Sequence, residues 1–139
     1  MRFEASTDVS APAQVVFDTY ADVEHWPSWT SSVTSVEKID PGPLKVGLRV
    51  RIRQPKLPVT VWQVTELVPG QEFSWQARAR GVVTTGTHRV VPNAGGGVRV
   101  EAVLEQAGPL GALVGLITWR LTKRYLRTEV DGIKAYCEA

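Results

Sequence analysis

The chain contains few of the residues that build disulfide frameworks or metal sites. Its 139 residues include one cysteine, Cys137, and two histidines, His25 and His88. A single thiol excludes an internal disulfide and a multi-cysteine metal site, and the two histidines are too far apart to form a metal-binding motif. The sequence also lacks G-x-G-x-x-G, P-loop and G-x-S-x-G motifs. We therefore predict neither a metal nor a cofactor.

A charge imbalance and a long apolar run are also missing. The 16 Lys and Arg residues nearly balance the 14 Asp and Glu residues, which argues against nucleic acid as the main partner. The longest weakly polar stretch, residues 107–119, is shorter than a membrane span and is broken by glycines and a proline, so we expect no stable membrane insertion. A free thiol and the absence of an apolar signal-peptide region lead us to expect a cytoplasmic protein.

The length predicts one domain over residues 1–139, and the apolar pattern predicts its elements. Residues 2–9 alternate between apolar and polar, which is typical of a half-buried strand. Ser10 and Pro12 then favour a helix start, and Pro27 ends a short helical region, so we expect two short helices after this strand. Six more strands follow, expected at residues 33–39, 48–54, 59–68, 72–80, 82–91 and 98–105.

After Gly108-Pro109 the apolar period changes to three and four residues. This pattern runs from Leu110 to about Tyr136 and predicts one amphipathic helix of roughly 27 residues, about 40 Å long. Consecutive strands joined by tight turns form antiparallel sheets, so the fold class is α+β. The long helix is the only element large enough to cover the apolar face of the sheet.

Several short motifs are spread along the chain. They are Ala11-Pro12-Ala13-Gln14-Val15-Val16-Phe17, Trp26-Pro27-Ser28-Trp29, Val64-Thr65-Glu66-Leu67-Val68-Pro69-Gly70, Phe73-Ser74-Trp75, Gly86-Thr87-His88-Arg89 and Gly132-Ile133-Lys134. In this order they resemble the START-like (SRPBCC) superfamily, whose fold is the helix grip of Bet v 1-like proteins. The later motifs are similar to the polyketide cyclase/dehydrase-like branch. The resemblance implies a curved seven-stranded antiparallel sheet wrapped around the C-terminal helix, with a cavity between them.

Aromatic and small side chains on the expected inner faces are the candidate ligand-binding residues. Trp75 shares a strand face with Phe73 and Ala77, a pattern that leaves room beside bulky rings, although plain core packing would give the same pattern. We expect the cavity to be lined by Trp62, Phe73, Trp75, Ala77, His88, Leu113, Ile117 and Trp119, with Trp29 near its mouth.

Two titratable residues are candidates for acid–base catalysis. His88 shares the parity of Gly86 and Val90, which places it on the inner face, and its reference pKa near 6.5 suits proton transfer. Glu66 shares the parity of Trp62 and Val64. The alternatives are a hydrogen-bonded structural histidine and a glutamate at a solvated strand end.

The remaining charged residues are expected at the surface. Arg49, Arg51 and Arg53 alternate with apolar residues and are predicted on the outer face of the sheet, unless a bulge turns Arg51 into the pocket. We expect Lys123, Arg124 and Arg127 on a solvated helix face, because three charges attract anionic lipid only weakly. His25 is expected at the surface.

Fold alone does not determine function in this superfamily. The favoured hypothesis is binding of a small hydrophobic molecule, such as a lipid, a polyketide or an isoprenoid, in the internal cavity. The second is a polyketide aromatase/cyclase or dehydratase that uses His88, and the third is a quinone chaperone or regulatory partner-binding module.

Overall fold

The computed structural model describes all residues 1–139 and contains seven strands and three helices. The strands form one antiparallel sheet in the order β1-β7-β6-β5-β4-β3-β2. The elements are β1 (Arg2–Val9), α1 (Ala13–Ala21), η1 (Val23–Ser28), β2 (Ser35–Lys38), β3 (Arg49–Arg53), β4 (Thr60–Val68), β5 (Glu72–Ala79), β6 (Val82–Pro92), β7 (Val98–Ala107) and α2 (Gly111–Glu138).

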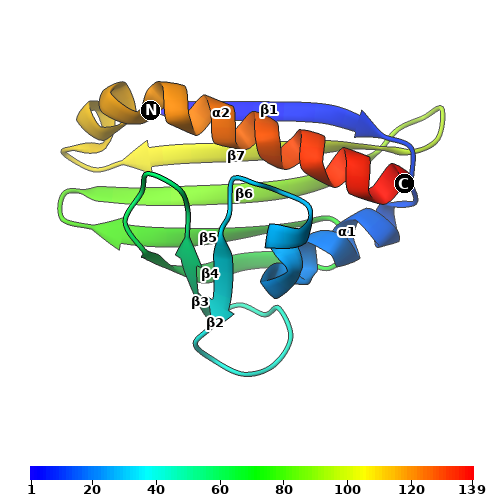
Figure 1. Ribbon diagram of the computed structural model, residues 1–139, viewed down its shortest axis with the longest axis horizontal. Helices are drawn as coiled ribbons and strands as arrows, with labels where there is room; N and C mark the ends of the chain where they lie inside the picture. Colours follow the sequence, from blue (N-terminus) through cyan, green and yellow to red (C-terminus); the bar gives the residue numbers. More distant parts are fainter.

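The α+β helix-grip arrangement expected from the sequence is confirmed. In Figure 1, α2 crosses one face of the curved sheet diagonally, and α1 lies beside its C-terminal end. The two short helices α1 and η1 lie between β1 and β2, as predicted. None of the helices combines the length and apolarity needed to cross a membrane.

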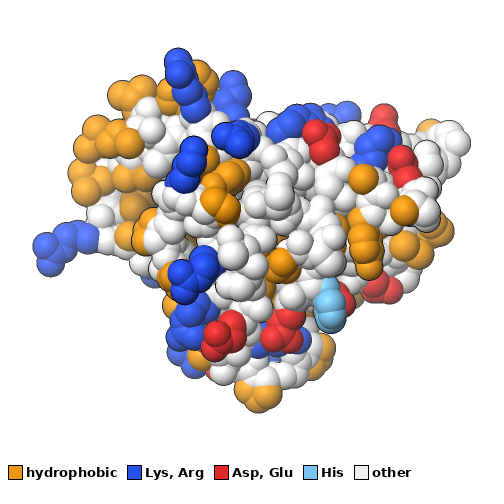
Figure 2. Space-filling view, in the orientation of Figure 1, with side chains coloured by type: hydrophobic (Ala, Val, Ile, Leu, Met, Phe, Trp, Pro, Cys, Tyr) orange, Lys and Arg blue, Asp and Glu red, His pale blue; other side chains and the backbone are white.

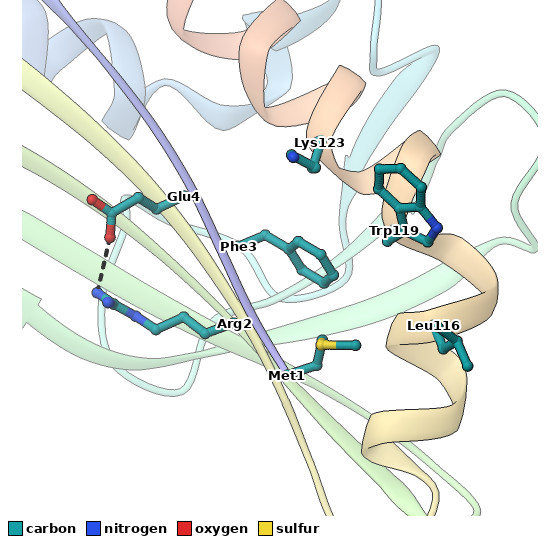
Figure 3. A pocket seen from close by; sticks show the side chains of 7 residues that line it. All are labelled: Met1, Arg2, Phe3, Glu4, Leu116, Trp119 and Lys123. Atoms are coloured by element: carbon teal, nitrogen blue, oxygen red, sulfur yellow. Dashed lines mark ion pairs between the residues drawn. The ribbon is translucent and has the colours of Figure 1, made fainter.

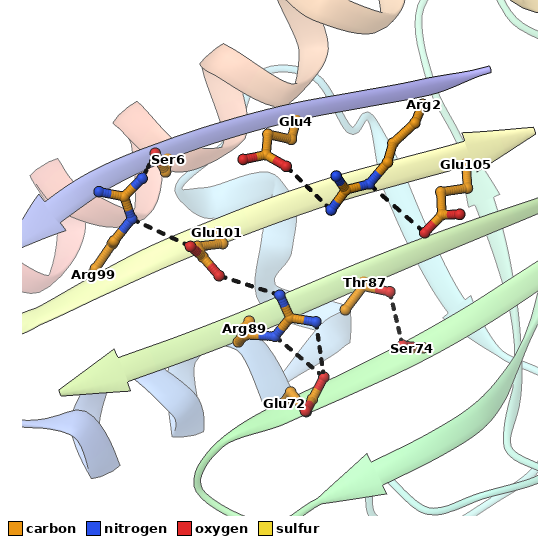
Figure 4. A network of polar contacts seen from close by, with 10 residues as sticks. All are labelled: Arg2, Glu4, Ser6, Glu72, Ser74, Thr87, Arg89, Arg99, Glu101 and Glu105. Atoms are coloured by element: carbon orange, nitrogen blue, oxygen red, sulfur yellow. Dashed lines mark hydrogen bonds and ion pairs between the residues drawn. The ribbon is translucent and has the colours of Figure 1, made fainter.

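The outer face of the sheet is polar and held by ion pairs. Figure 4 shows Arg89 on β6 between Glu72 on β5 and Glu101 on β7, at 3.5 and 3.2 Å. On β3, Arg49 and Arg51 also point outward, and they pair with Asp40 and Glu37. The predicted outer-face position of these arginines is therefore confirmed, and no bulge turns Arg51 inward.

The inner face carries a cluster of aromatic side chains packed beneath the C-terminal half of α2. The rings of Trp26, Phe73 and Trp75 surround the ring of His88, with centroids 4.7–5.4 Å apart. From α2, the side chains of Val130 and Ile133 are fully buried against this layer. Gly132 lies against the carbonyl of Trp29, where a Cβ atom has no room. Helix and core are thus in direct contact over this half.

The N-terminal half of α2 meets the sheet differently. Gly111 and Gly115 are buried against the end of β7, and a Cβ atom on either would lie 2.7–2.8 Å from an oxygen of Gln106. This close approach fixes the rotation of the helix. Further along, larger gaps remain between α2 and the strands, and there the cavity lies.

Two isoleucines of α2 test this asymmetry. We expect Ile133→Ala to lower the free energy of unfolding by about 2–5 kcal/mol, because a fully buried side chain leaves a cavity. The matched control Ile117→Ala should change it by less than about 0.5 kcal/mol, because the Ile117 side chain is 73% exposed. Urea denaturation of both variants measures the difference, and equal losses would contradict this packing of α2.

Candidate ligand-binding cavity

A cavity of about 370 Å³ lies between the sheet and the N-terminal half of α2. Sites for small molecules typically measure about 300–1,000 Å³, so the volume suits a small ligand. Its walls come from β4, β5, β6, β7 and α2, together with the loop between β3 and β4. Side chains distant in sequence therefore meet around one space.

The strand side of the cavity carries two indole rings, and the helix side combines aliphatic and polar side chains. Trp62, Trp75 and Ala77 line it from β4 and β5, as the sequence predicted for their positions. Thr84, Gly86 and His88 line it from β6, which confirms the predicted inner parity of that strand. The helix contributes a stripe at spacings of three and four: Val114, Thr118, Leu121 and Tyr125.

Two contacts frame the mouth of the cavity. The hydroxyl of Tyr125 donates to the carbonyl oxygen of Pro55 and so joins α2 to the β3–β4 loop. At the start of α2, the Leu110 amide donates to the Gly81 carbonyl at 2.8 Å, in the turn between β5 and β6. The β3–β4 loop, the β5–β6 turn and residues 110–125 thus border the same end of the cavity.

The inner end of the cavity holds a buried polar triad. His88 Nδ1 lies 3.2 Å from Glu129 Oε2, and the Tyr20 hydroxyl donates to the same oxygen at 3.3 Å. All three side chains are buried, and they come from β6, α2 and α1. When Glu129 is ionised it can only accept, so Nδ1–H of a neutral imidazole donates to it and the lone pair of Nε2 is then free.

Burial and the Glu129 charge both act on the phenol of this triad. Desolvation is the larger cause and the neighbouring carboxylate the second, and together they raise the pKa of Tyr20 well above its usual value near 10. The phenol therefore stays protonated and remains a donor to Glu129. This second donor helps to keep the carboxylate oriented toward His88.

Several buried polar atoms have no hydrogen-bond partner. They are Trp29 Nε1, Trp62 Nε1, His88 Nε2 and Gln106 Oε1, and the last three belong to residues that line the cavity. A buried donor or acceptor without a partner costs about 1–3 kcal/mol, so native structures rarely leave several together. Three of these atoms therefore belong to the cavity wall, and water or a bound molecule that reaches them would supply the missing partners.

The structure corrects the predicted helix side of the site. Leu113, Ile117 and Trp119 are exposed and do not line the cavity. The reason is the close contact of Gly111 and Gly115 with β7, which turns Val114 and Thr118 inward. Leu113 and Ile117, one position before these residues, and Trp119, one position after Thr118, consequently point away from the cavity.

Three further predicted positions also differ. Glu66 is exposed, because a β-bulge between Val64 and Glu66 shifts the register by one residue and moves Glu66 to the outer face. Trp29 does not lie near the mouth but packs edge-on to Tyr20 in the core. Phe73 is fully buried behind His88 and supports its ring without lining the cavity.

Sequence reasoning missed Glu129 and Gln106, although signals for both were present. Glu129 belongs to a series of residues spaced four apart on the helix, namely Leu121, Tyr125, Glu129 and Ile133, and it is the only acid in this series. Gln106 continues the inward parity of β7, one residue beyond the predicted end of that strand. A polar residue in an apolar series is the feature that could have identified each.

A second hollow is a surface groove between β1 and α2. Figure 3 shows Met1 and Phe3 on one side and Leu116 and Trp119 on the other, with Lys123 above. Arg2 and Glu4 also border the groove, but their ion pair turns away from it. This groove lies at the surface, apart from the cavity beneath α2, and carries none of the unpaired polar atoms.

A curved antiparallel sheet that grips a long C-terminal helix around an apolar cavity defines a helix-grip protein. Residues 1–138 match the family described as polyketide cyclase/dehydrase and lipid transport. The chain belongs to this family. The comparison with curated proteins gave no match.

Solved structures share the fold at low sequence identity. The hypothetical protein jhp0584 from Helicobacter pylori superposes with a TM-score of 0.80 at 15% identity, over 98% of this chain and 86% of that one. The Zhui aromatase/cyclase from Streptomyces sp. R1128 gives 0.74 at 16%, over 99% and 93%. The di-domain ARO/CYC StfQ of the steffimycin biosynthetic pathway gives 0.73 at 13%, over 99% of this chain and 50% of StfQ.

The raised pKa of Tyr20 predicts a pH-dependent effect of Tyr20→Phe. Near pH 8 the variant should be about 1 kcal/mol less stable, because it lacks the hydrogen bond to Glu129. Above pH about 10 the unfolded wild-type chain ionises this phenol while the folded chain keeps it protonated, so wild-type stability falls and the deficit shrinks. Urea denaturation of both proteins at pH 8 and at higher pH measures this, and a constant deficit would contradict it.

Proposed function

We propose that this protein binds a small, flat hydrophobic molecule with polar groups at its edges in the cavity between the sheet and α2. The indole and aliphatic walls accept the apolar body of the ligand. The polar groups of the ligand pair with Trp62 Nε1, Gln106 Oε1 and His88 Nε2. Binding then replaces unpaired buried atoms with hydrogen bonds and removes apolar ligand surface from water.

The observation that carries this proposal is the coincidence of the cavity with three unpaired buried polar atoms. A plain core would be packed to high density and would leave few such atoms. The chemistry is selective: an indole N–H needs an acceptor, and an amide oxygen needs a donor. A hydroxylated aromatic ketone offers both on a flat skeleton.

The family supports the same class of ligand. Its description names lipid transport and polyketide chemistry, and two of the structural neighbours are described as an aromatase/cyclase and an ARO/CYC. These neighbours are less than 25% identical to the chain, so they support the fold and the ligand class rather than a particular ligand.

Filling the cavity should abolish binding. We expect Ala77→Phe to weaken binding of the neutral fluorescent probe N-phenyl-1-naphthylamine at least tenfold, because the new ring occupies ligand space beside Trp75. Probe fluorescence and quenching of the cavity indoles measure the affinity.

Ala135→Phe on the exposed face of α2 is the matched control and should bind the probe like the wild type. Unchanged affinity in Ala77→Phe, together with a stability loss of several kcal/mol, would mean that position 77 is tightly packed core and that the probe does not use this cavity.

A second candidate function, dehydration or cyclisation of a β-hydroxyketone, is favoured by the His88–Glu129 pair. With Nδ1–H directed to Glu129, Nε2 can accept a proton from the carbon between carbonyl and carbinol. The C–C double bond forms from the electron pair of the broken C–H bond as the carbinol C–O bond breaks. The imidazolium Nε2–H then protonates the departing hydroxide to water, which restores the neutral imidazole. Glu129 stabilises the imidazolium formed in this step.

This candidate is tested with 4-hydroxy-4-(2-naphthyl)butan-2-one, whose dehydration produces a conjugated enone detected by absorbance. Catalysis by His88 predicts turnover that falls about 10²–10⁴-fold in His88→Ala with little change in KM. Thr84→Val, which alters another residue lining the same cavity, should retain turnover. Absence of enone formation above the rate without protein leaves the binding function and removes this candidate.

A further inference from the structure

Exposed apolar side chains gather at the end of the molecule where α2 begins. Leu113, Leu116 and Ile117 lie there in the first two turns of α2, and the side chains of all three are exposed. Figure 2 shows hydrophobic side chains over this end, with Lys and Arg side chains around them. A contiguous apolar surface bordered by polar groups is typical of an interaction site.

Unpaired positive charges surround the same end. Most Lys and Arg residues elsewhere form ion pairs, for example Arg49 with Asp40 and Lys134 with Glu138. Six exposed cations without an ion pair lie on the three segments that frame the cavity mouth. They are Lys56 on the β3–β4 loop, Arg78 and Arg80 at the β5–β6 turn, and Arg120, Lys123 and Arg124 on α2.

Negative charge is absent from these segments. Residues 41–65, 73–100 and 106–128 contain no Asp or Glu. The carboxylates of Glu4 and Glu105, at the ends of β1 and β7, are paired with Arg2. In Figure 2 the acidic side chains lie away from the end where α2 begins. A chain with a net charge of only +2 therefore concentrates positive potential at one end.

Trp119 joins the apolar and the basic groups. The residue is 39% exposed beside the groove of Figure 3, and its ring centroid lies 5.1 Å from the Arg120 guanidinium and 5.5 Å from Lys123 Nζ. An amphipathic ring flanked by cations fits the boundary between headgroups and acyl chains. The other four tryptophans are buried.

We propose that this end of the molecule docks reversibly on an anionic lipid bilayer, with the cavity mouth facing the membrane. Leu113, Leu116, Ile117 and Trp119 enter the headgroup boundary, and the six cations contact anionic headgroups. The sequence analysis considered only three charges on α2, and one of them, Arg127, pairs with Asp131. It underestimated the number of cations on this surface, because folding adds those of the β3–β4 loop and the β5–β6 turn. The idea that a hydrophobic ligand enters the cavity from the bilayer rests on the proposed function. The docking proposal does not depend on it.

Membrane binding is preferred to an acidic protein partner because of how the apolar groups are placed. They protrude on several sides of the first turns of α2, as insertion into a fluid boundary allows. A folded partner would instead need a matching rigid concave surface. The cations are also spread over three separate segments, so each can contact a different mobile headgroup.

Co-sedimentation with phosphatidylcholine vesicles, with and without about one third phosphatidylglycerol, tests the docking surface. We expect binding only to the anionic vesicles and its loss at high salt. The triple variant Arg120→Gln/Lys123→Gln/Arg124→Gln should bind about a hundredfold more weakly, from roughly fivefold per cation. Leu113→Ser/Ile117→Ser should also weaken binding at least tenfold.

Two matched controls lie in the loop between β2 and β3. Lys45 is likewise unpaired, and the Val46 side chain is 60% exposed. Lys45→Gln and Val46→Ser should bind vesicles like the wild type. Brominated phosphatidylcholine in the anionic vesicles should quench part of the tryptophan fluorescence, and Trp119→Phe should abolish that quenching.

Three results would overturn the proposal. One is equal binding by the triple variant and the Lys45→Gln control. Another is that this end of the molecule binds a soluble acidic protein while the protein does not bind vesicles. The third is that the protein forms a dimer that dissociates in Leu113→Ser/Ile117→Ser and does not bind vesicles. Affinity for N-phenyl-1-naphthylamine, measured without vesicles, should be unchanged in all surface variants, so failure of docking and failure of the cavity function are told apart.

Discussion

The helix α2 must cover the apolar face of a curved seven-stranded sheet, and the rest of the structure depends on how closely it does so. Along its C-terminal half, Val130 and Ile133 are fully buried and Gly132 touches the backbone at Trp29. Along its N-terminal half, contact is made through Gly111 and Gly115 at the edge, while the centre stays open. One half therefore stabilises the fold, and the other half forms the wall of a cavity.

The boundary between these halves is marked by a buried carboxylate. Glu129 is the last residue of α2 that lines the cavity; it accepts a hydrogen bond from Tyr20 on α1 and lies 3.2 Å from His88 Nδ1 on β6. An isolated buried charge is expensive, so the two donors are required wherever this acid remains ionised. The same arrangement orients the imidazole and leaves Nε2 unpaired at the cavity. Stability of the core and chemistry of the site thus share one residue.

The outer surface is divided in a corresponding way. The convex face of the sheet is covered by ion pairs such as Arg89 with Glu72 and Glu101, which compensate each other (Figure 4). The end at the cavity mouth has cations without acids and apolar side chains without cover. The opening, the apolar groups and the uncompensated charge therefore lie together, and this coincidence connects the ligand hypothesis to the docking surface.

The order of elements, the fold class and the inner parity of β6 and β5 could be predicted from the sequence, because alternation and helical period depend on residues only two to four positions apart. Trp62, Trp75, Ala77 and His88 were placed correctly for that reason. The bulge that turns Glu66 outward and the glycine contacts that turn Leu113 and Ile117 outward depend on neighbouring elements, so local pattern alone misplaced them. The meeting of His88 with Glu129, 41 residues away, and of Tyr20 with Glu129, 109 residues away, was decided only by the tertiary structure, because packing α1 and α2 onto the sheet is what brings these distant side chains within hydrogen-bond distance.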